Sequence, residues 1–152
     1  MIEGFGGTAV RLPVRRLDPE ARLPAYARPG DAGLDLASAE DVEVGPGERV
    51  QVKTGLAIAI PQGFAGMVLP RSGLASRQGL TLANSPGLID AGYRGELTCA
   101  VVNLDRRDSV SIKRGDRIAQ LVVVPIAALI PEWTEELPQS ERGTGGFGST
   151  GR

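Results

Sequence analysis

Glu48-Arg-Val-Gln-Val-Lys-Thr54 predicts the fold class most directly, because its apolar and polar residues alternate. A period of two places Val50, Val52 and Thr54 on one face of an extended strand. The next run, Leu56-Ala-Ile-Ala-Ile60, alternates large and small apolar residues and predicts a strand packed tightly on one side. The centre of the chain is therefore expected to be β-structure.

Three more apolar runs predict strands that are buried on both faces: 66–69, 96–103 and 118–124. Many of the 21 glycines and 11 prolines lie between such runs, and prolines such as Pro61, Pro70 and Pro125 end or flank them. The only predicted helix covers 72–78, with Ser72 as its N-cap and Gly79 as its stop. We predict an all-β fold, a barrel or double-sheet jelly roll with one short helix.

The chain has 152 residues and a net charge of -1, which favours one domain and argues against a nucleic-acid partner. It contains no apolar run long enough to span a membrane and no secretory signal, so we expect a cytoplasmic protein. The residues after Pro138 are rich in glycine and lack aliphatic side chains. We therefore predict a β domain over 1–138 and a mobile arm over 139–152.

Two absences restrict the chemistry. The chain has no histidine, which excludes Ser-His-Asp and Cys-His catalysis and the usual histidine metal sites. Its single cysteine, Cys99, lies in an apolar run and is interpreted as a buried packing residue. Carboxylate, hydroxyl, tyrosine, arginine, backbone amide and a hard metal ion remain for catalysis.

The loop from Asn84 to Glu96 holds an acid, Asp90, and an aromatic residue, Tyr93, among several glycines. The apolar pair Leu88-Ile89 suggests that Asp90 is at least partly shielded from water. We interpret this loop as a glycine-rich hairpin that forms a substrate pocket. The alternative is an ordinary β-hairpin with a buried, hydrogen-bonded Asp90.

Two segments could bind phosphate. At the predicted helix start, Arg71, Ser72 and Gly73 combine a guanidinium, a hydroxyl and close backbone approach. A capped helical turn without a ligand is the alternative. The tail offers Arg142 and hydroxyl groups for a phosphate and Phe147 for stacking on a base, although a solvated low-complexity terminus has the same composition.

Single polar residues in apolar surroundings allow two interpretations each. Asp35 is either a solvent-facing strand residue or a carboxylate near a metal-bound phosphate. Gln120 makes either a core hydrogen bond or a phosphate contact. Asp116 and Arg117 are interpreted as an ion pair at a turn. Three aromatic residues are interpreted as packing residues: Tyr26, Phe64 and Trp133.

Five segments, taken in order, resemble the five motifs of the trimeric deoxyuridine triphosphatases (dUTPases): Asp31-Ala-Gly-Leu-Asp-Leu36, Pro70-Arg-Ser-Gly-Leu-Ala75, Asn84 to Glu96, Arg114 to Leu121 and Arg142 to Gly151. Each is weak alone, but five in this order are specific. The resemblance implies a jelly-roll-like barrel of the β-clip type and a homotrimer with active sites at subunit interfaces. It also implies hydrolysis of dUTP to dUMP and pyrophosphate, with Mg²⁺ on the triphosphate.

The resemblance also implies residue roles on the nucleoside side. Asp90 would activate the water that attacks the α-phosphorus in line. Tyr93 would lie against the deoxyribose and exclude a 2′-hydroxyl. The contacts to the uracil edge would come from Asn84, Leu88, Ile89 and Thr98.

On the phosphate side, the implied residues are Arg71, Ser72, Gly73 and Gln120. Asp35 would order water around Mg²⁺. In the tail, Arg142 and hydroxyls such as that of Ser149 would clamp the γ-phosphate. Phe147, next to Gly148, would stack over the uracil.

Two other functions remain open on the same scaffold. A dCTP deaminase shares the β fold and the trimer, but the intact Tyr93 segment and the Phe147 tail favour the triphosphatase. A non-catalytic nucleotide-binding regulator is the second alternative, and it would be expected to lack motif residues that are all present here.

Overall fold

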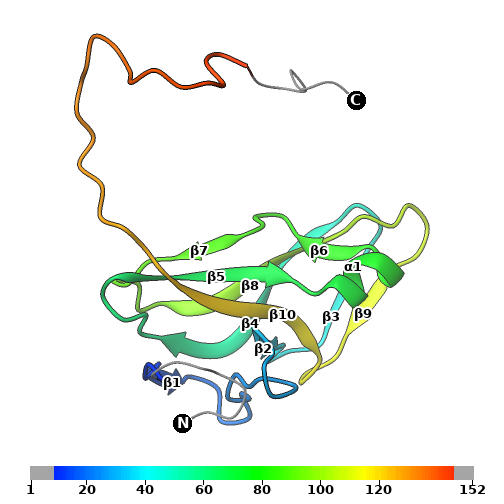
Figure 1. Cartoon of the computed structure of the whole chain (residues 1–152). Helices are drawn as coiled ribbons and strands as arrows, with labels where there is room; N and C mark the ends of the chain where they lie inside the picture. Colours follow the sequence, from blue (N-terminus) through cyan, green and yellow to red (C-terminus); the bar gives the residue numbers. More distant parts are fainter. Residues whose placement is uncertain (1–8, 146–152) are drawn as a thin grey trace.

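The computed structural model describes residues 9–145, which form two facing four-stranded sheets and a smaller strand pair (Figure 1). The first sheet has the order β1-β4-β8-β6, built from Val14–Arg16, Arg49–Ile58, Glu96–Asn103 and Leu80–Leu82. The second has the order β2-β10-β5-β7, built from Leu34–Ala37, Arg117–Pro125, Phe64–Pro70 and Gly87–Ile89. The pair is β3 with β9, Val42–Val44 and Val110–Ile112.

The hydrophobic core lies between these sheets. Val52 and Leu97 of the first sheet and Leu36 and Leu121 of the second are fully or almost fully buried in one cluster. Two sheets that share one core form a sandwich-like, all-β architecture. The all-β, jelly-roll-like prediction is therefore confirmed.

Strand β4 joins most of the two predicted runs, 48–54 and 56–60, into one ten-residue strand. Val50, Val52 and Thr54 share the inward face as predicted, with Val52 and Thr54 buried. The ladder to β8 is irregular between Lys53 and Ala57. A bulge of this kind bends a strand and re-aims its side chains.

The prediction of strands buried on both faces is wrong for β8, whose residues alternate between buried and accessible. Leu97 and Cys99 point into the core, whereas Thr98 between them is exposed. Only one face of β8 meets the opposite sheet within this chain, so the apolar composition of the run overstated its burial.

The helix α1 spans Ser72–Gln78, the predicted range, and ends at Gly79 with φ 67°. The prediction of Ser72 as N-cap is wrong. The N-cap is Arg71, whose backbone is extended and whose side chain makes no capping bond. Its carbonyl accepts hydrogen bonds from the N–H groups of Leu74 and Ala75, so the backbone alone closes the first turn.

The predicted hairpin at 84–96 is also wrong. Strand β7 pairs with β5 in the second sheet, whereas β8 pairs with β4 and β6 in the first. The loop 90–95 therefore carries the chain from one sheet to the other. A Gly-rich loop between two strands does not by itself specify that the strands pair with each other.

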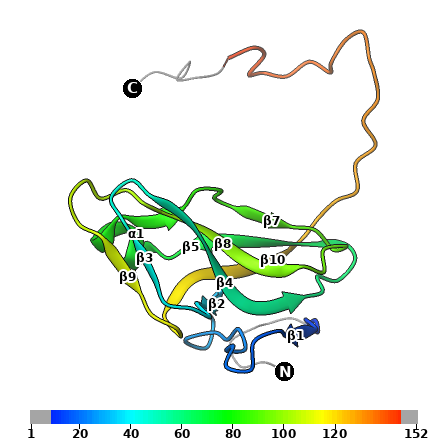
Figure 2. The ribbon, with the colours of Figure 1, turned by 180° about the vertical axis from the view of Figure 1, so that it is seen from behind.

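Beyond Pro125 the segment 126–145 leaves the two sheets without forming a strand or helix, as both views show (Figures 1 and 2). It exposes large apolar side chains: Ile126, Leu129, Ile130, Trp133 and Leu137. The interpretation of Trp133 as a packing residue is therefore wrong within the single chain.

Phe64 does pack against the core, and Tyr26 is half-buried. In the part of the chain described, no helix is long and apolar enough to cross a membrane.

Candidate active site

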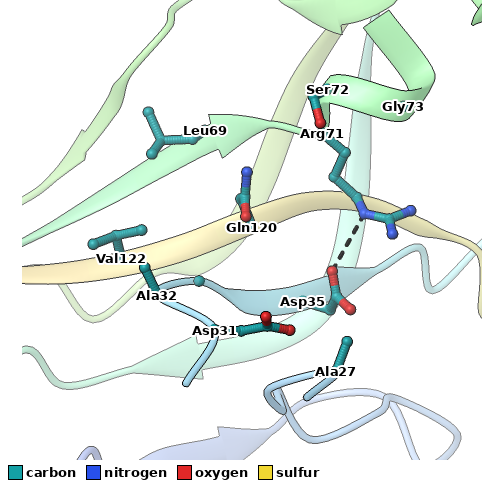
Figure 3. A pocket seen from close by; sticks show the side chains of 11 residues that line it. Ala27, Asp31, Ala32, Asp35, Leu69, Arg71, Ser72, Gly73, Gln120 and Val122 are labelled. Carbon is teal, nitrogen blue, oxygen red and sulfur yellow. Dashed lines mark ion pairs between the residues drawn. The ribbon is translucent and has the colours of Figure 1, made fainter. Parts of the chain in front are cut away.

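A first pocket, about 380 Å³, opens between strands β2, β5 and β10 and the start of α1 (Figure 3). It brings together five predicted site residues from segments far apart in the sequence: Asp35, Arg71, Ser72, Gly73 and Gln120. Leu69 and Val122 form an apolar part of its lining. We call this cavity the β2–β10 pocket.

Asp35 is held between two arginines at the edge of this pocket. Its Oδ1 lies 3.3 Å from Nε of Arg71, and its Oδ2 lies 2.9 Å from Nη1 of Arg117. The Asp35 side chain is only 18% exposed, so it is not the solvent-facing residue of the alternative interpretation. Nη1 of Arg71 also donates to the Arg117 carbonyl at 3.1 Å, which joins the three residues into one network.

The predicted pair of Asp116 and Arg117 is wrong, because Arg117 pairs with Asp35 instead. The Asp116 carboxylate accepts a hydrogen bond from the Lys113 N–H at 2.9 Å and so closes the turn before β10. The register of β10 against β2 shifts between Arg117 and Ala119. This irregularity breaks the period of two and explains why sequence reasoning missed Arg117 as a neighbour of the site.

Gln120 lies in the centre of β10 opposite Asp35. Its Nε2 donates to the Pro70 carbonyl at 3.0 Å, which fits the predicted hydrogen bond and leaves its Oε1 on the side of β2. A Cβ added at Gly33 would lie 2.5 Å from that Oε1. Gly33 is therefore required for the amide to lie against β2, a role that its sequence context did not reveal.

Asp31, which lines the pocket, and Arg77, in the adjoining helix α1, have local structural partners. Nε of Arg77 donates to the Gly73 carbonyl at 3.2 Å across one turn of α1. The Asp31 carboxylate accepts a hydrogen bond from the Arg28 N–H at 2.9 Å. These contacts fix the helix start and the loop before β2, the two segments that frame the β2–β10 pocket.

A second pocket, about 180 Å³, lies at the loop that connects β7 with β8. Four of its lining residues were predicted on the nucleoside side: Leu88, Ile89, Tyr93 and Thr98, together with the predicted base Asp90. Glu96 and Leu97 complete the lining. We call it the β7–β8 pocket.

Asp90 is exposed in this chain, so the expected shielding from water by Leu88 and Ile89 is wrong. Leu88 is itself 62% exposed because the two residues stand on an edge strand. The Asp90 carbonyl accepts a hydrogen bond from the Tyr93 N–H at 3.0 Å, which closes a tight turn. Water can thus reach the Asp90 carboxylate directly.

Three predicted groups lie outside both pockets or outside the described residues. Asn84 is exposed beside the β7–β8 pocket, and its Nδ2 lies 3.2 Å from the position of a Cβ on Gly87. Arg142 lies on the exposed segment 126–145, where its Nε donates to the Gly145 carbonyl at 2.9 Å. Phe147, Gly148 and Ser149 lie beyond the residues that the structure describes.

The two pockets share no lining residue. The chain therefore presents a pocket lined by Arg71, Asp31 and Asp35 and a pocket with Asp90 and Tyr93 as separate parts. The first pocket suits phosphate groups, since the planar guanidinium of an arginine can donate two parallel hydrogen bonds to phosphate oxygens. The second suits a small ring held against an aromatic residue.

Cys99 takes no part in either pocket. It is buried in the core, and burial raises the pKa of its thiol to about 12. A thiol with this pKa is protonated at neutral pH and is a poor nucleophile. Its interpretation as a packing residue is confirmed.

Within residues 9–145 no three acidic or cysteine side chains gather in a way that could hold a metal ion directly. Asp35 offers a carboxylate at the pocket edge, and both of its oxygens face arginines. A single carboxylate with both oxygens ion-paired does not offer direct metal ligands, so Asp35 fits only an ion such as Mg²⁺ whose own ligands are water and substrate phosphates.

The comparisons with known proteins agree with the five motifs. The family model of dUTPase matches residues 19–151. A deoxyuridine 5′-triphosphate nucleotidohydrolase of Thermobifida fusca is 56% identical over 142 residues, which cover 93% of this chain and 79% of that protein. Such identity over nearly the whole chain leaves no doubt about common ancestry.

Solved structures show the same fold. The dUTPase of Staphylococcus bacteriophage 80alpha with dUPNHPP has a TM-score of 0.89 at 36% identity, covering 95% of this chain and 100% of the phage chain. A dUTPase mutant from phage phi11 of S. aureus, described with a structural Mg(II) ion, has a TM-score of 0.80 at 32% identity, covering 86% of this chain and 100% of its own. On this evidence the chain belongs to the dUTPase family.

Proposed function

We propose that this protein hydrolyses dUTP to dUMP and pyrophosphate. The observation that carries the proposal is the β7–β8 pocket, which places Asp90 and Tyr93 on one short loop beside Leu88, Ile89 and Thr98. Backbone groups of 88–90 and the side chains of Asn84 and Thr98 would bind the uracil edge. Tyr93 would pack against the deoxyribose and exclude a 2′-hydroxyl by a clash.

Asp90 would hold and deprotonate the attacking water. Its carboxylate is exposed in the single chain, so a water molecule can occupy the position between it and an α-phosphorus. An in-line attack needs chiefly a positioned water and compensation of the phosphate charge. The loop turn between Asp90 and Tyr93 would fix the water relative to the sugar.

The β2–β10 pocket would supply that compensation. Arg71 and the hydroxyl of Ser72 stand where α1 begins, and Gln120 faces them from β10. Gly73 lets the phosphates approach the backbone. Mg²⁺ carried on the triphosphate would neutralise part of its charge, and Asp35 would hold water around that ion.

The two pockets share no lining residue within one chain, which supports a site that is completed by groups from more than one subunit. We propose a homotrimer with active sites at its subunit interfaces. The exposed apolar side chains of 126–137 support this assembly, since Leu129, Ile130 and Trp133 are each more than 80% exposed here. Size-exclusion chromatography with light scattering tests the trimer directly, and a stable monomer would contradict it.

The arm 139–152 would close over the bound nucleotide, and residues 1–138 would form the remaining domain. In this proposal Arg142 and Ser149 hold the γ-phosphate, while Phe147 and Gly148 cover the uracil. The enzyme would act in the cytoplasm, where it limits uracil in DNA and supplies dUMP for dTMP synthesis. It needs neither a nucleic-acid partner nor a membrane.

The decisive experiment measures pyrophosphate release from dUTP, dTTP, dCTP and UTP, with and without Mg²⁺. We expect release from dUTP alone, accelerated by Mg²⁺. Ammonia released from dCTP would instead establish the deaminase, since a deaminase and a triphosphatase share this fold. Nucleotide binding without any turnover would establish a regulator.

A further inference from the structure

The ring of Tyr93 is held in place by Gly95, the last residue of its own loop, and by Glu96, the first residue of β8. Its Oη donates to the Glu96 carbonyl at 2.8 Å. A Cβ added at Gly95 would lie 2.5 Å from that Oη and 2.7 Å from Cζ, so the ring lies directly over Gly95. The position of the Glu96 carbonyl therefore determines where the phenol sits.

The Glu96 side chain is tied to the opposite strand. Its Oε1 accepts a hydrogen bond from the Gly55 N–H at 2.9 Å, and this contact is partly buried. The bond falls inside the irregular part of the β4–β8 ladder, where Lys53 pairs with Thr98 and the next pair is Ala57 with Glu96. A side-chain carboxylate thus replaces a backbone acceptor at the point where the regular ladder is interrupted.

The partner of this carboxylate is itself firmly packed. Gly55 has φ 68°, and a Cβ there would lie 2.7 Å from the Asp18 Cβ and 2.9 Å from the Ala21 Cβ. Its carbonyl accepts hydrogen bonds from the N–H groups of Leu17, at 2.8 Å, and Asp18, at 3.2 Å. The bulge at Gly55 is a fixed point to which the first residue of β8 is attached.

We infer that Glu96 is a positioning residue for sugar discrimination, acting through the hydroxyl of Tyr93. Its carboxylate fixes the start of β8 to the β4 bulge, and its carbonyl fixes the phenol. Without the carboxylate the start of β8 can shift, and the Tyr93 ring then no longer closes the space that a 2′-hydroxyl would occupy. This inference rests on the proposed role of Tyr93 against the deoxyribose.

The test compares kcat/KM for dUTP with kcat/KM for UTP in the full-length enzyme. Glu96→Ala should reduce the preference for dUTP by about three- to tenfold, the worth of one hydrogen bond. Glu96→Gln should keep the preference, since its amide oxygen can still accept from the Gly55 N–H. Glu96→Asp retains the charge but is one methylene shorter, so it should behave like Glu96→Ala and serves if the alanine variant does not fold.

A matched control exists in Glu48, whose Oε2 accepts from the Gly45 N–H at 2.8 Å in an exposed turn. Glu48→Ala removes the same kind of bond and should leave the dUTP/UTP ratio unchanged. A general loss of folded enzyme lowers both rates equally and does not move this ratio. An unchanged ratio in both Glu96→Ala and Glu96→Asp would overturn the inference.

A double-mutant cycle separates the inference from the proposed function. Tyr93→Phe keeps the ring and removes the hydroxyl, so Glu96→Ala should have little further effect on the ratio in that background. Fully additive effects would mean that Glu96 does not act through Tyr93. If Tyr93→Ala leaves the ratio unchanged, the proposed sugar role of Tyr93 fails; if only the Glu96 variants leave it unchanged, the positioning role alone fails.

Discussion

Asp90, the proposed general base, contributes little to the fold of the single chain. It is exposed, and only its backbone carbonyl takes part in the turn with Tyr93. We predict that Asp90→Asn lowers kcat for dUTP by about 10²- to 10⁴-fold, the usual contribution of a general base. The KM should change little, because the amide is nearly isosteric.

Steady-state kinetics and the thermal midpoint of the variant check this prediction. The matched control is Asp108→Asn, in the exposed turn before β9, which should leave kcat unchanged. A fully active Asp90→Asn enzyme would show that another group activates the water.

A second prediction for a single residue concerns the reactivity of Cys99. Burial raises the pKa of its thiol from 9.0 to about 12. In the native state at pH 8, alkylation should be about 10³-fold slower than in guanidinium, since three pKa units separate the thiolate populations. Burial of the neutral thiol favours folding fully below pH 9, and this contribution is lost as the pH rises towards 12. Mass spectrometry after timed iodoacetamide exposure measures the protection, and equal labelling in both states would contradict it.

At the scale of elements, the contact between β2 and β10 shapes the β2–β10 pocket, where we propose that the phosphates bind. Gly33→Ala would place a methyl group 2.5 Å from Oε1 of Gln120 and push the amide out of position. We predict that KM for dUTP rises roughly tenfold or more, the worth of a hydrogen bond to a charged group. The fold should survive, because β10 remains paired with β5 along its length.

Gly45→Ala is a suitable control for the same change in backbone entropy. A Cβ there meets only the Glu48 side chain, whose Oε2 at 3.2 Å is its nearest atom, so KM should stay near the wild-type value. Comparable effects in both variants would mean that the Gly33 position acts on general stability and not on Gln120.

The sequence predicts those elements whose signal is local. The alternation of 48–54 and the stop residue Gly79 contain enough information to locate the first part of β4 and the end of α1. Short strands such as β2 and β7 were not separated from their loops, because three or four residues carry too little periodicity. Which strand β7 pairs with depends on long-range contacts, so the hairpin interpretation failed.

For the candidate site too, the sequence predicts only those residues whose signal is local. Asp90, Tyr93 and Arg71 could be chosen because their residue types and neighbours are informative in themselves. Arg117 and Gly33 could not, since their positions depend on a β-bulge and on contact with a distant strand. The exposure of Asp90 was also hidden, because burial is a property of the assembled sheets.

For the whole molecule, we expect the β domain to fold and assemble without the arm. We predict that removal of residues 142–152 leaves the assembled β domain intact, since the removed residues contain no aliphatic side chain. Hydrolysis of dUTP should fall by about 10²-fold or more, because the nucleotide would lose its clamp and its stacking ring.

Light scattering and circular dichroism report on assembly and fold, and pyrophosphate release reports on activity. A variant with Phe147→Ala alone provides an internal comparison for the stacking contribution. An unchanged rate after truncation would assign the arm no role in turnover.

Trp133 is the single tryptophan of the chain and stands fully exposed on the segment 126–145. Almost all of the intrinsic fluorescence of the protein therefore originates from a part that lies outside the two sheets. An indole surrounded by water emits at longer wavelengths than one enclosed by apolar side chains. The emission maximum thus reports, without any added label, whether this segment is in solvent or covered by another subunit, and dilution of the protein turns that signal into an assembly isotherm.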